Sequence, residues 1–193
     1  MQRTILQAAV GVALWASMAS CNQQANTTQA DAAATGTPPT SASASQQAPQ
    51  TPEPAKVIPE FTFYILKSGI RFTKADLAKT GNQVFILFDP TCGHCQDEAK
   101  HIGEHYDKVK TANFYFVSMN DPALMSTFLE TYAKPLVGRP NVELLYDRNA
   151  EFINRFHVPS QYPATYVYGN DGQLKDYWNG ERDIKQIIAS IQR

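Results

Sequence analysis

Apolar residues along the 193-residue chain form short runs with the composition of strands. Five such runs are rich in β-branched and aromatic residues and lie at 61–66, 83–88, 113–119, 142–146 and 164–168. The run at 83–88 is apolar on both faces, which is typical of a central strand in a largely parallel sheet. After it, apolar residues such as Ala99 and Ile102 recur at helical spacing, which predicts a helix over 93–109.

Turn and capping residues complete this pattern. Thr73 is a good N-cap for a short helix, and Asp121-Pro122 joins an N-cap to a proline at the first helical position. Gly169-Asn170-Asp171-Gly172 is a strong hairpin turn. The other expected elements are strands at 70–72 and 173–178 and helices at 74–79, 121–133, 149–156 and 182–192. This order predicts an α/β fold with a mixed central sheet flanked by helices and an N-terminal β extension.

Composition divides the chain into three parts. Residues 1–21 have a basic start, an apolar stretch and then small residues, which is the layout of a secretory signal. Residues 22–57 are rich in Gln, Ala, Thr, Ser and Pro without aromatic residues, and they predict a flexible tether. Residues 58–193 predict a single domain. The net charge of −1 indicates no nucleic-acid partner.

The signal-like segment ends in Met18-Ala19-Ser20-Cys21, which resembles a bacterial lipobox. The cysteine of a lipobox is lipidated and becomes the new N-terminus, although leucine is more usual than methionine at the first position. An ordinary cleaved signal with an incidental cysteine is the alternative. If Cys21 carries lipid, the other two of the three cysteines form an isolated pair. We therefore expect an exported protein, lipid-anchored to a bacterial membrane and facing the periplasm or the cell exterior.

Cys92 and Cys95 form a C-x2-C motif between a buried strand and a helix. Free backbone N–H groups and the helix dipole favour the thiolate at Cys92, just before the helix. Cys95 lies one turn further and should be more buried. We therefore assign Cys92 as the nucleophile that forms a mixed disulfide, and Cys95 as the residue that resolves it. A protonated His94 would add positive charge beside the thiolate and make the disulfide more oxidising, whereas a solvated His94 would have little effect.

The chain resembles the thioredoxin-like thiol–disulfide oxidoreductases, and most closely the membrane-tethered TlpA/ResA-like group, over about 61–193. The resemblance rests on FILFDPTCGHC and, about seventy residues later, on FHVPSQYPATYVYGNDGQL. It implies a cis peptide bond before Pro163, with the backbone of Tyr162 facing the cysteines and open to an incoming polypeptide. It also implies that Glu98, at i+3 from Cys95, carries the proton of the buried thiol. An exposed helix glutamate is the alternative.

The resemblance implies exchange of disulfides with protein substrates and with a membrane redox partner. No cofactor is expected other than the redox-active Cys92–Cys95 disulfide. The chain departs from the family at Thr91, where a tryptophan is usual, and at Ile86, where thioredoxin has a buried aspartate. The direction of electron flow stays open. TlpA/ResA-like proteins are usually reductants, whereas the CGHC spacer, shared with protein disulfide isomerase, favours oxidation or isomerisation.

Two other functions stay open from the sequence. A thioredoxin-fold protein that delivers copper would combine the two cysteines with His101 and His105, which are i,i+4 on a helix, or with the distant His157. The short C-x2-C-x5-H-x3-H spacing and the expected exposure of the helix histidines argue against this, so no metal is expected. The second alternative is a non-catalytic binding module with a vestigial dithiol. The presence of both cysteines together with Pro163 argues against that reading.

Overall fold

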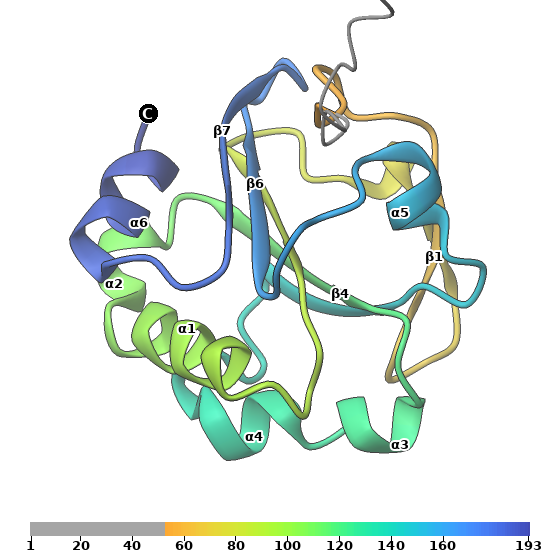
Figure 1. Ribbon diagram of the computed structural model, residues 1–193, viewed down its shortest axis with the longest axis horizontal. Coiled ribbons are helices and arrows are strands. Elements are labelled where there is room, and N and C mark those ends of the chain that lie inside the picture. Colours follow the sequence, from red (N-terminus) through yellow and green to blue (C-terminus); the bar gives the residue numbers. More distant parts are fainter. Residues whose placement is uncertain (1–52) are drawn as a thin grey trace, which may run out of the picture. The chain divides into compact units, whose positions relative to one another are not determined.

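The computed structural model describes residues 53–193 (Figure 1). The predicted signal segment, Cys21 and most of the predicted tether lie outside the described residues. In chain order the elements are β1 (Thr62–Ile65), β2 (Arg71–Thr73), the 3-10 helix η1 (Lys74–Asp76), β3 (Gln83–Leu87), α1 (Gly93–Glu104), α2 (Tyr106–Val109), β4 (Asn113–Ser118), α3 (Pro122–Met125), α4 (Phe128–Tyr132), η2 (Lys134–Leu136), β5 (Val142–Tyr146), α5 (Glu151–Arg155), β6 (Ala164–Tyr168), β7 (Leu174–Asn179) and α6 (Ile184–Ile191). None of these helices is long and apolar enough to cross a membrane.

The strands form one seven-stranded mixed sheet in the order β2-β1-β5-β4-β3-β6-β7. Strands β3, β4 and β5 run parallel to one another, and the other neighbouring pairs are antiparallel. Strand β3 is buried at every position, as its apolar sequence predicted. Strands β1 and β2 extend the sheet beyond β5. The predicted mixed α/β fold with an N-terminal β extension is therefore confirmed.

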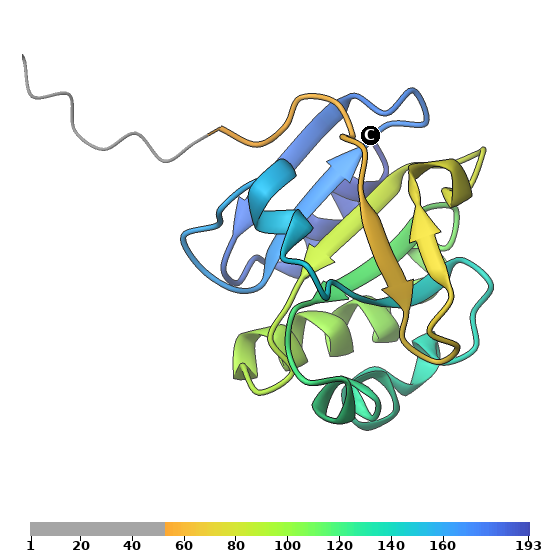
Figure 2. The same ribbon diagram turned by 90° about the vertical axis from the view of Figure 1, so that its right-hand side faces the viewer.

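Alternate side chains of the sheet point to its two opposite faces, and each face packs into its own hydrophobic core. Val84 and Ile86 of β3 pack in the core that also contains residues of α1, α2, α4 and α6. Phe85 and Leu87 point to the opposite face, which α5 covers (Figure 2). That second core is largely aromatic: the Phe152 and Phe156 rings of the α5 region stack with their centroids 4.5 Å apart. Because both faces are packed, the carboxyl end of β3 is a firm base for the loop that follows.

Three predicted helices are shorter or more broken in the structure. The helix expected over 93–109 is interrupted at His105 and becomes α1 and α2. The helix expected over 121–133 is split into α3 and α4, because the Ser126 hydroxyl donates to a backbone carbonyl at 2.8 Å and competes with the helical ladder. Over 74–79 only the single turn η1 forms.

The folded part begins earlier than composition predicted. Residues 54–57 were assigned to the tether, but they pack on the domain. The N–H of Ala55 donates to the carbonyl of Phe156 at 2.8 Å, and the Ala55 carbonyl accepts from the Tyr168 hydroxyl at 3.0 Å. Backbone pairing needs no particular side chain, so composition alone does not reveal it.

Candidate active site

The loop after β3 places Cys92 at the N-cap of α1. The Asp89 carboxylate accepts from the N–H and the hydroxyl of Thr91 at 2.8 and 2.7 Å, which closes a tight turn. The N–H of Cys92 donates to the Asp89 carbonyl, and the Cys92 carbonyl accepts from the N–H of Cys95 and of Gln96, each at 3.1 Å. The Cys92 side chain therefore stands where the free N–H groups of the first helical turn are closest.

The two thiols differ in exposure. Both cysteines are free thiols in the structure; Cys92 is half-buried, and Cys95 is only 2% exposed. The Cys95 sulfur accepts from the N–H of Asp89 at 3.5 Å. Burial raises the pKa of the Cys95 thiol, and the negative charge of Glu98 adds to this rise. The Cys95 thiol therefore stays protonated unless a base removes its proton, whereas the Cys92 thiol is partly accessible to solvent.

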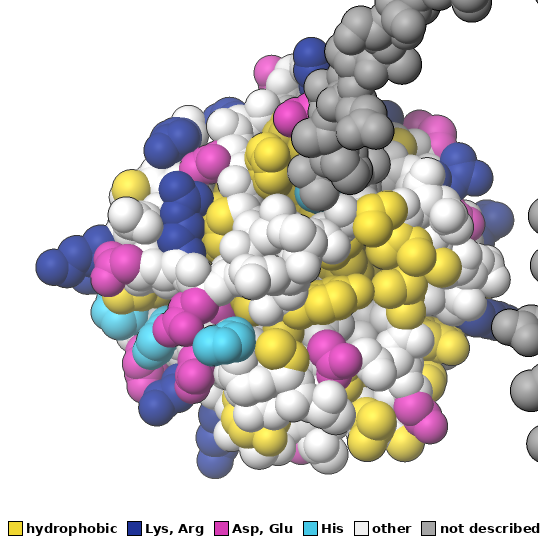
Figure 3. Space-filling model, viewed as in Figure 1, with side chains coloured by type: hydrophobic (Ala, Val, Ile, Leu, Met, Phe, Trp, Pro, Cys, Tyr) yellow, Lys and Arg dark blue, Asp and Glu magenta, His cyan; other side chains and the backbone are white. Residues whose placement is uncertain are grey.

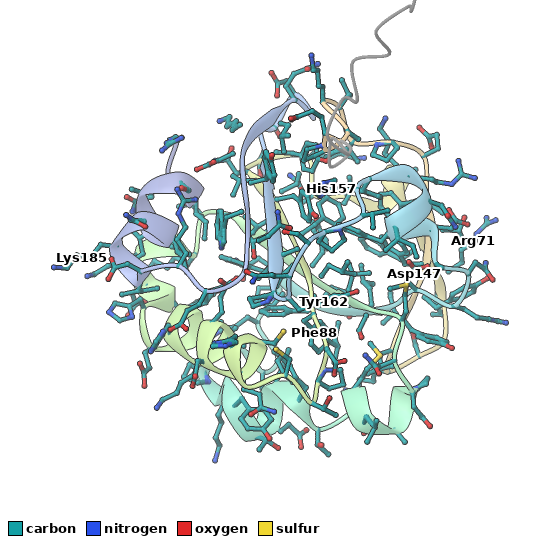
Figure 4. The ribbon with its side chains drawn as sticks, viewed as in Figure 1. Arg71, Phe88, Asp147, His157, Tyr162 and Lys185 are labelled. Atoms are coloured by element: carbon teal, nitrogen blue, oxygen red, sulfur yellow. The ribbon has the colours of Figure 1, made fainter. Side chains whose placement is uncertain are left out.

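The segment before β6 completes a groove beside Cys92. The Tyr162–Pro163 peptide bond is cis, as the resemblance implied. The Cys92 thiol lies 4.0 Å from the Tyr162 carbonyl oxygen. In Figure 4, Tyr162 and Phe88, the residue that follows β3, lie together near the N-terminal end of α1. The groove has a volume of about 480 Å³ and is lined by Asp89, Cys92, His94, Gln161, Tyr162, Gly180 and Glu181.

Glu98 is buried against the end of the sheet, which the sequence left undecided. Its side chain is 3% exposed. The Thr165 hydroxyl donates to Glu98 Oε1 at 2.6 Å, and the Trp178 indole N–H donates to Oε2 at 3.2 Å. Burial raises the pKa of the Glu98 carboxyl to about 7, against the lowering effect of these two donors and of the Arg182 charge. A carboxyl with this pKa exchanges protons readily at neutral pH.

His94 has a partner that the sequence did not suggest. Its Nδ1 lies 3.0 Å from the carboxylate of Glu181, in the loop between β7 and α6. Both side chains are more than half exposed, and both line the groove. Figure 3 shows histidine and acidic side chains gathered on this side of the molecule, over α1 and the neighbouring loop. Glu181 is therefore the acidic partner that the structure gives His94 at the edge of the groove.

The other histidines do not form a cluster with the cysteines. His101 and His105 are half-buried on α1 and at its C-cap, and the ring of His105 contacts the His101 carbonyl. His157 is buried on the aromatic side of the sheet, with its Nδ1 2.8 Å from the hydroxyl of Tyr166. Within residues 53–193 no three His, Cys, Asp or Glu side chains group closely enough to hold a metal ion.

Sequence reasoning missed four residues that support the site: Thr165, Trp178, Glu181 and Arg182. One of them left a signal, because Thr165 is a polar residue inside the otherwise apolar strand 164–168. The roles of the others depend on how β7 and its following loop fold over α1. That arrangement has no counterpart in local sequence spacing.

A C-x2-C pair at the start of a helix, beside a cis-proline loop and a mixed sheet, defines a thioredoxin-like protein. Residues 54–177 match the model of the AhpC/TSA family. The chain therefore belongs to the AhpC/TSA family. Among curated proteins, no sequence matches the chain.

Solved structures with a similar fold include the following three proteins. A secreted Mycobacterium tuberculosis disulfide oxidoreductase, homologous to Escherichia coli DsbE, is 23% identical with a TM-score of 0.56, over 68% of this chain and 94% of that one. A thio-disulfide isomerase from Thermus thermophilus is 21% identical with a TM-score of 0.55, over 72% and 95%. Arabidopsis thaliana ScoI, solved with copper bound, is 13% identical with a TM-score of 0.53, over 72% and 99%. These likenesses support the thioredoxin-like fold.

Proposed function

We propose that this chain is a membrane-tethered, extracytoplasmic thiol–disulfide oxidoreductase that exchanges disulfides with protein substrates through Cys92 and Cys95. The observation that carries the proposal is the unequal placing of the two thiols. Cys92 meets an open groove at a helix N-cap, whereas Cys95 is buried one turn away, next to a buried carboxyl. This is the arrangement that a nucleophile and a resolving thiol require.

The chemistry follows from that placing. In the reducing direction, the Cys92 thiolate attacks one sulfur of a substrate disulfide, and the other substrate sulfur leaves as a thiolate. This step forms a mixed disulfide. Glu98 then accepts the proton of Cys95, and the Cys95 thiolate attacks the Cys92 sulfur. The Cys92–Cys95 disulfide forms, the second substrate sulfur leaves, and the two leaving thiolates take up two protons, one of them returned by Glu98. The oxidising direction is the reverse of these steps.

The groove suits a polypeptide substrate. Tyr162 lines the groove with its carbonyl oxygen 4.0 Å from the Cys92 sulfur, and within the described residues the Tyr162 N–H has no backbone partner. An extended segment placed next to Cys92 is therefore able to pair with this backbone, as in β-augmentation. The groove is open and shallow rather than enclosed, which fits a chain segment better than a small cofactor.

The activity is tested by insulin reduction with dithiothreitol and by transfer of the Cys92–Cys95 disulfide to a reduced, unfolded protein. The wild-type chain should perform at least one of these reactions, and Cys92→Ser should perform neither. Alkylation of cells with a thiol-blocking reagent then gives the direction: a reduced pair indicates a reductant, and an oxidised pair an oxidase. Copper bound in place of thiol exchange, or neither activity, would refute the proposal.

The location rests on residues outside the described part of the chain. The signal-like segment and the lipobox-like Cys21 support export and lipid anchoring. The apolar segment could also hold the chain at the membrane by itself, so the test is the mass of the mature protein and not its location. The wild-type protein should begin at Cys21 and carry the mass of a lipid there by mass spectrometry, and Cys21→Ser should lack this mass. Absence of lipid mass from the wild-type protein would argue against the lipid anchor.

A further inference from the structure

Glu98 is held by two donors from the hairpin β6–β7, one on each carboxylate oxygen. Thr165 of β6 donates to Oε1 at 2.6 Å, and Trp178 of β7 donates to Oε2 at 3.2 Å. All three side chains are buried, with Thr165 fully inaccessible to solvent. Two donors to a carboxylate favour its charged form and restrict its rotation, so the Glu98 carboxylate is held in one orientation one turn beyond Cys95 on α1.

Trp178 is itself held by the loop that follows it. The Arg182 guanidinium carbon lies 4.7 Å from the centre of the Trp178 ring, a cation–π contact. The same guanidinium donates to Asp176 at 3.3 Å, and Asp176 also accepts from the Ser190 hydroxyl of α6 at 2.6 Å. Asp176 and Trp178 are two residues apart on β7 and therefore share one face of the strand. Contacts therefore connect Glu98, through Trp178, Arg182 and Asp176, to Ser190 near the C-terminal end of α6.

The register of the sheet explains why the carboxyl comes from α1. Thr165 lies directly opposite Ile86 in the antiparallel pairing of β6 with β3. Ile86 is the position where the resemblance would place a buried aspartate, and its apolar side chain offers neither a carboxyl nor a donor. Glu98 therefore reaches the sheet next to that position from the helix above, and the strand beside it supplies the hydroxyl.

We propose that Thr165 and Trp178, the latter braced by Arg182, are positioning residues that keep Glu98 ready to accept the Cys95 proton in the resolving step. The inference rests on the proposed thiol–disulfide exchange. It also assigns a task to the hairpin and loop that follow the cis-proline, beyond closing the sheet. The proton leaves the Cys95 sulfur as the Cys95–Cys92 bond forms, and the released substrate thiolate takes it from Glu98.

The charged and titratable groups that face Glu98 are few. On α1 this group is Cys95, and in the loop after β7 the groups are Arg182 and Glu181. Arg182 favours the carboxylate, and Glu181 opposes it with a smaller effect. Burial has the largest effect on the pKa of Glu98 and raises it, and the two neutral donors are the strongest effects that oppose this rise, so removing either donor should raise the pKa further.

The decisive variant is Thr165→Val, which removes the donor and keeps the branched shape. The rate of reduction of a disulfide substrate by the dithiol form is measured from pH 5 to pH 9. We expect the midpoint of the pH profile to rise by about one unit and the rate at pH 7 to fall about fivefold, the effect of losing one hydrogen bond to a charged group. Thr165→Ser, which restores a hydroxyl, should return the profile to within about twofold of the wild type.

Further variants separate positioning from packing. Trp178→Phe keeps a ring but removes the N–H, and it should shift the pH profile in the same direction. Thr131→Val, at an exposed position on α4, is the matched control and should leave the profile unchanged. In the Glu98→Gln background, Thr165→Val should have no further effect on the profile. The inference would be overturned if Thr165→Val and Trp178→Phe both left the pH profile unchanged. It would also be overturned if Thr165→Val shifted the profile of Glu98→Gln as much as it shifts that of the wild type.

A second measurement does not depend on turnover. The carboxyl carbon of Glu98, followed by NMR with labelled glutamate, should titrate at higher pH in Thr165→Val than in the wild type. An unchanged titration would overturn the inference while leaving the proposed function intact. Absence of thiol exchange in the wild type would overturn the proposed function and, with it, the assigned role of both donors.

Discussion

Burial of Glu98 should make the stability of the folded protein depend on pH in a specific way. The side chain is 3% exposed, and folding raises the pKa of its carboxyl from 4.5 to about 7 because burial disfavours the charged form. Between these pH values the unfolded chain has lost this proton and the folded chain has kept it. The folded protein therefore binds more protons, and its stability must fall as pH rises.

The magnitude follows from the two pKa values. A group whose pKa is raised on folding contributes its full stability below about pH 4.5, and this contribution is lost as pH rises through about 7. Each pH unit in this window is worth about 1.4 kcal/mol, so this carboxyl should lower the free energy of unfolding by about 3 kcal/mol between pH 5 and pH 8. Glu98→Gln remains neutral throughout and should lack this loss.

The assay is urea unfolding of the dithiol form, followed by far-ultraviolet circular dichroism at pH 5, 6, 7 and 8. Glu98→Gln and the wild type should be similar at pH 5, and the variant should be more stable by about 3 kcal/mol at pH 8. Glu104→Gln, at an exposed position on the same helix, is the matched control and should follow the wild type. A difference between Glu98→Gln and the wild type that stays constant from pH 5 to pH 8 would refute the reasoning.

Three further predictions concern the cysteines and the groove. Cys95→Ser should accumulate a mixed disulfide through Cys92 that is visible by non-reducing gel and mass spectrometry; absence of the adduct would contradict the assigned roles. His94→Ala should make the reduction potential in a glutathione titration more negative, because it removes a charge that favours the thiolate. The expected change is up to about 30 mV, which is tenfold in the equilibrium constant. An unchanged potential would show that His94 is only a spacer between the cysteines. Gly180→Ala should lower the free energy of unfolding by about 1–2 kcal/mol in urea, because Gly180 has a φ of +77° that alanine adopts only with strain. The backbone is fixed there, since the Gly180 N–H donates to the Pro163 carbonyl beside the groove at 2.7 Å. An unchanged free energy of unfolding would show that the loop adjusts.

Local patterns predicted most of the fold. The five apolar runs are all strands, and the C-x2-C pair lies between β3 and α1 as expected. Boundaries are less reliable where side chains compete with the backbone, as at Ser126, or where a segment joins the domain through its own backbone groups, as at Ala55. Neither kind of interaction leaves a periodic signal in the residues.

The available chemistry follows from the local sequence: two thiols with two residues between them at a helix start, a histidine in that spacer, a proline before a strand, and a glutamate one turn after the second thiol. These are consequences of spacing along one chain, which helix and strand geometry convert directly into neighbours. Whether Glu98 faces water or the sheet, and which residues hold it there, depends instead on how distant parts of the chain pack together. Thr165 and Trp178 are 67 and 80 residues away from Glu98 in sequence. They meet it because the hairpin β6–β7 pairs with β3 beneath α1, and a contact made by strand pairing is invisible to any local pattern.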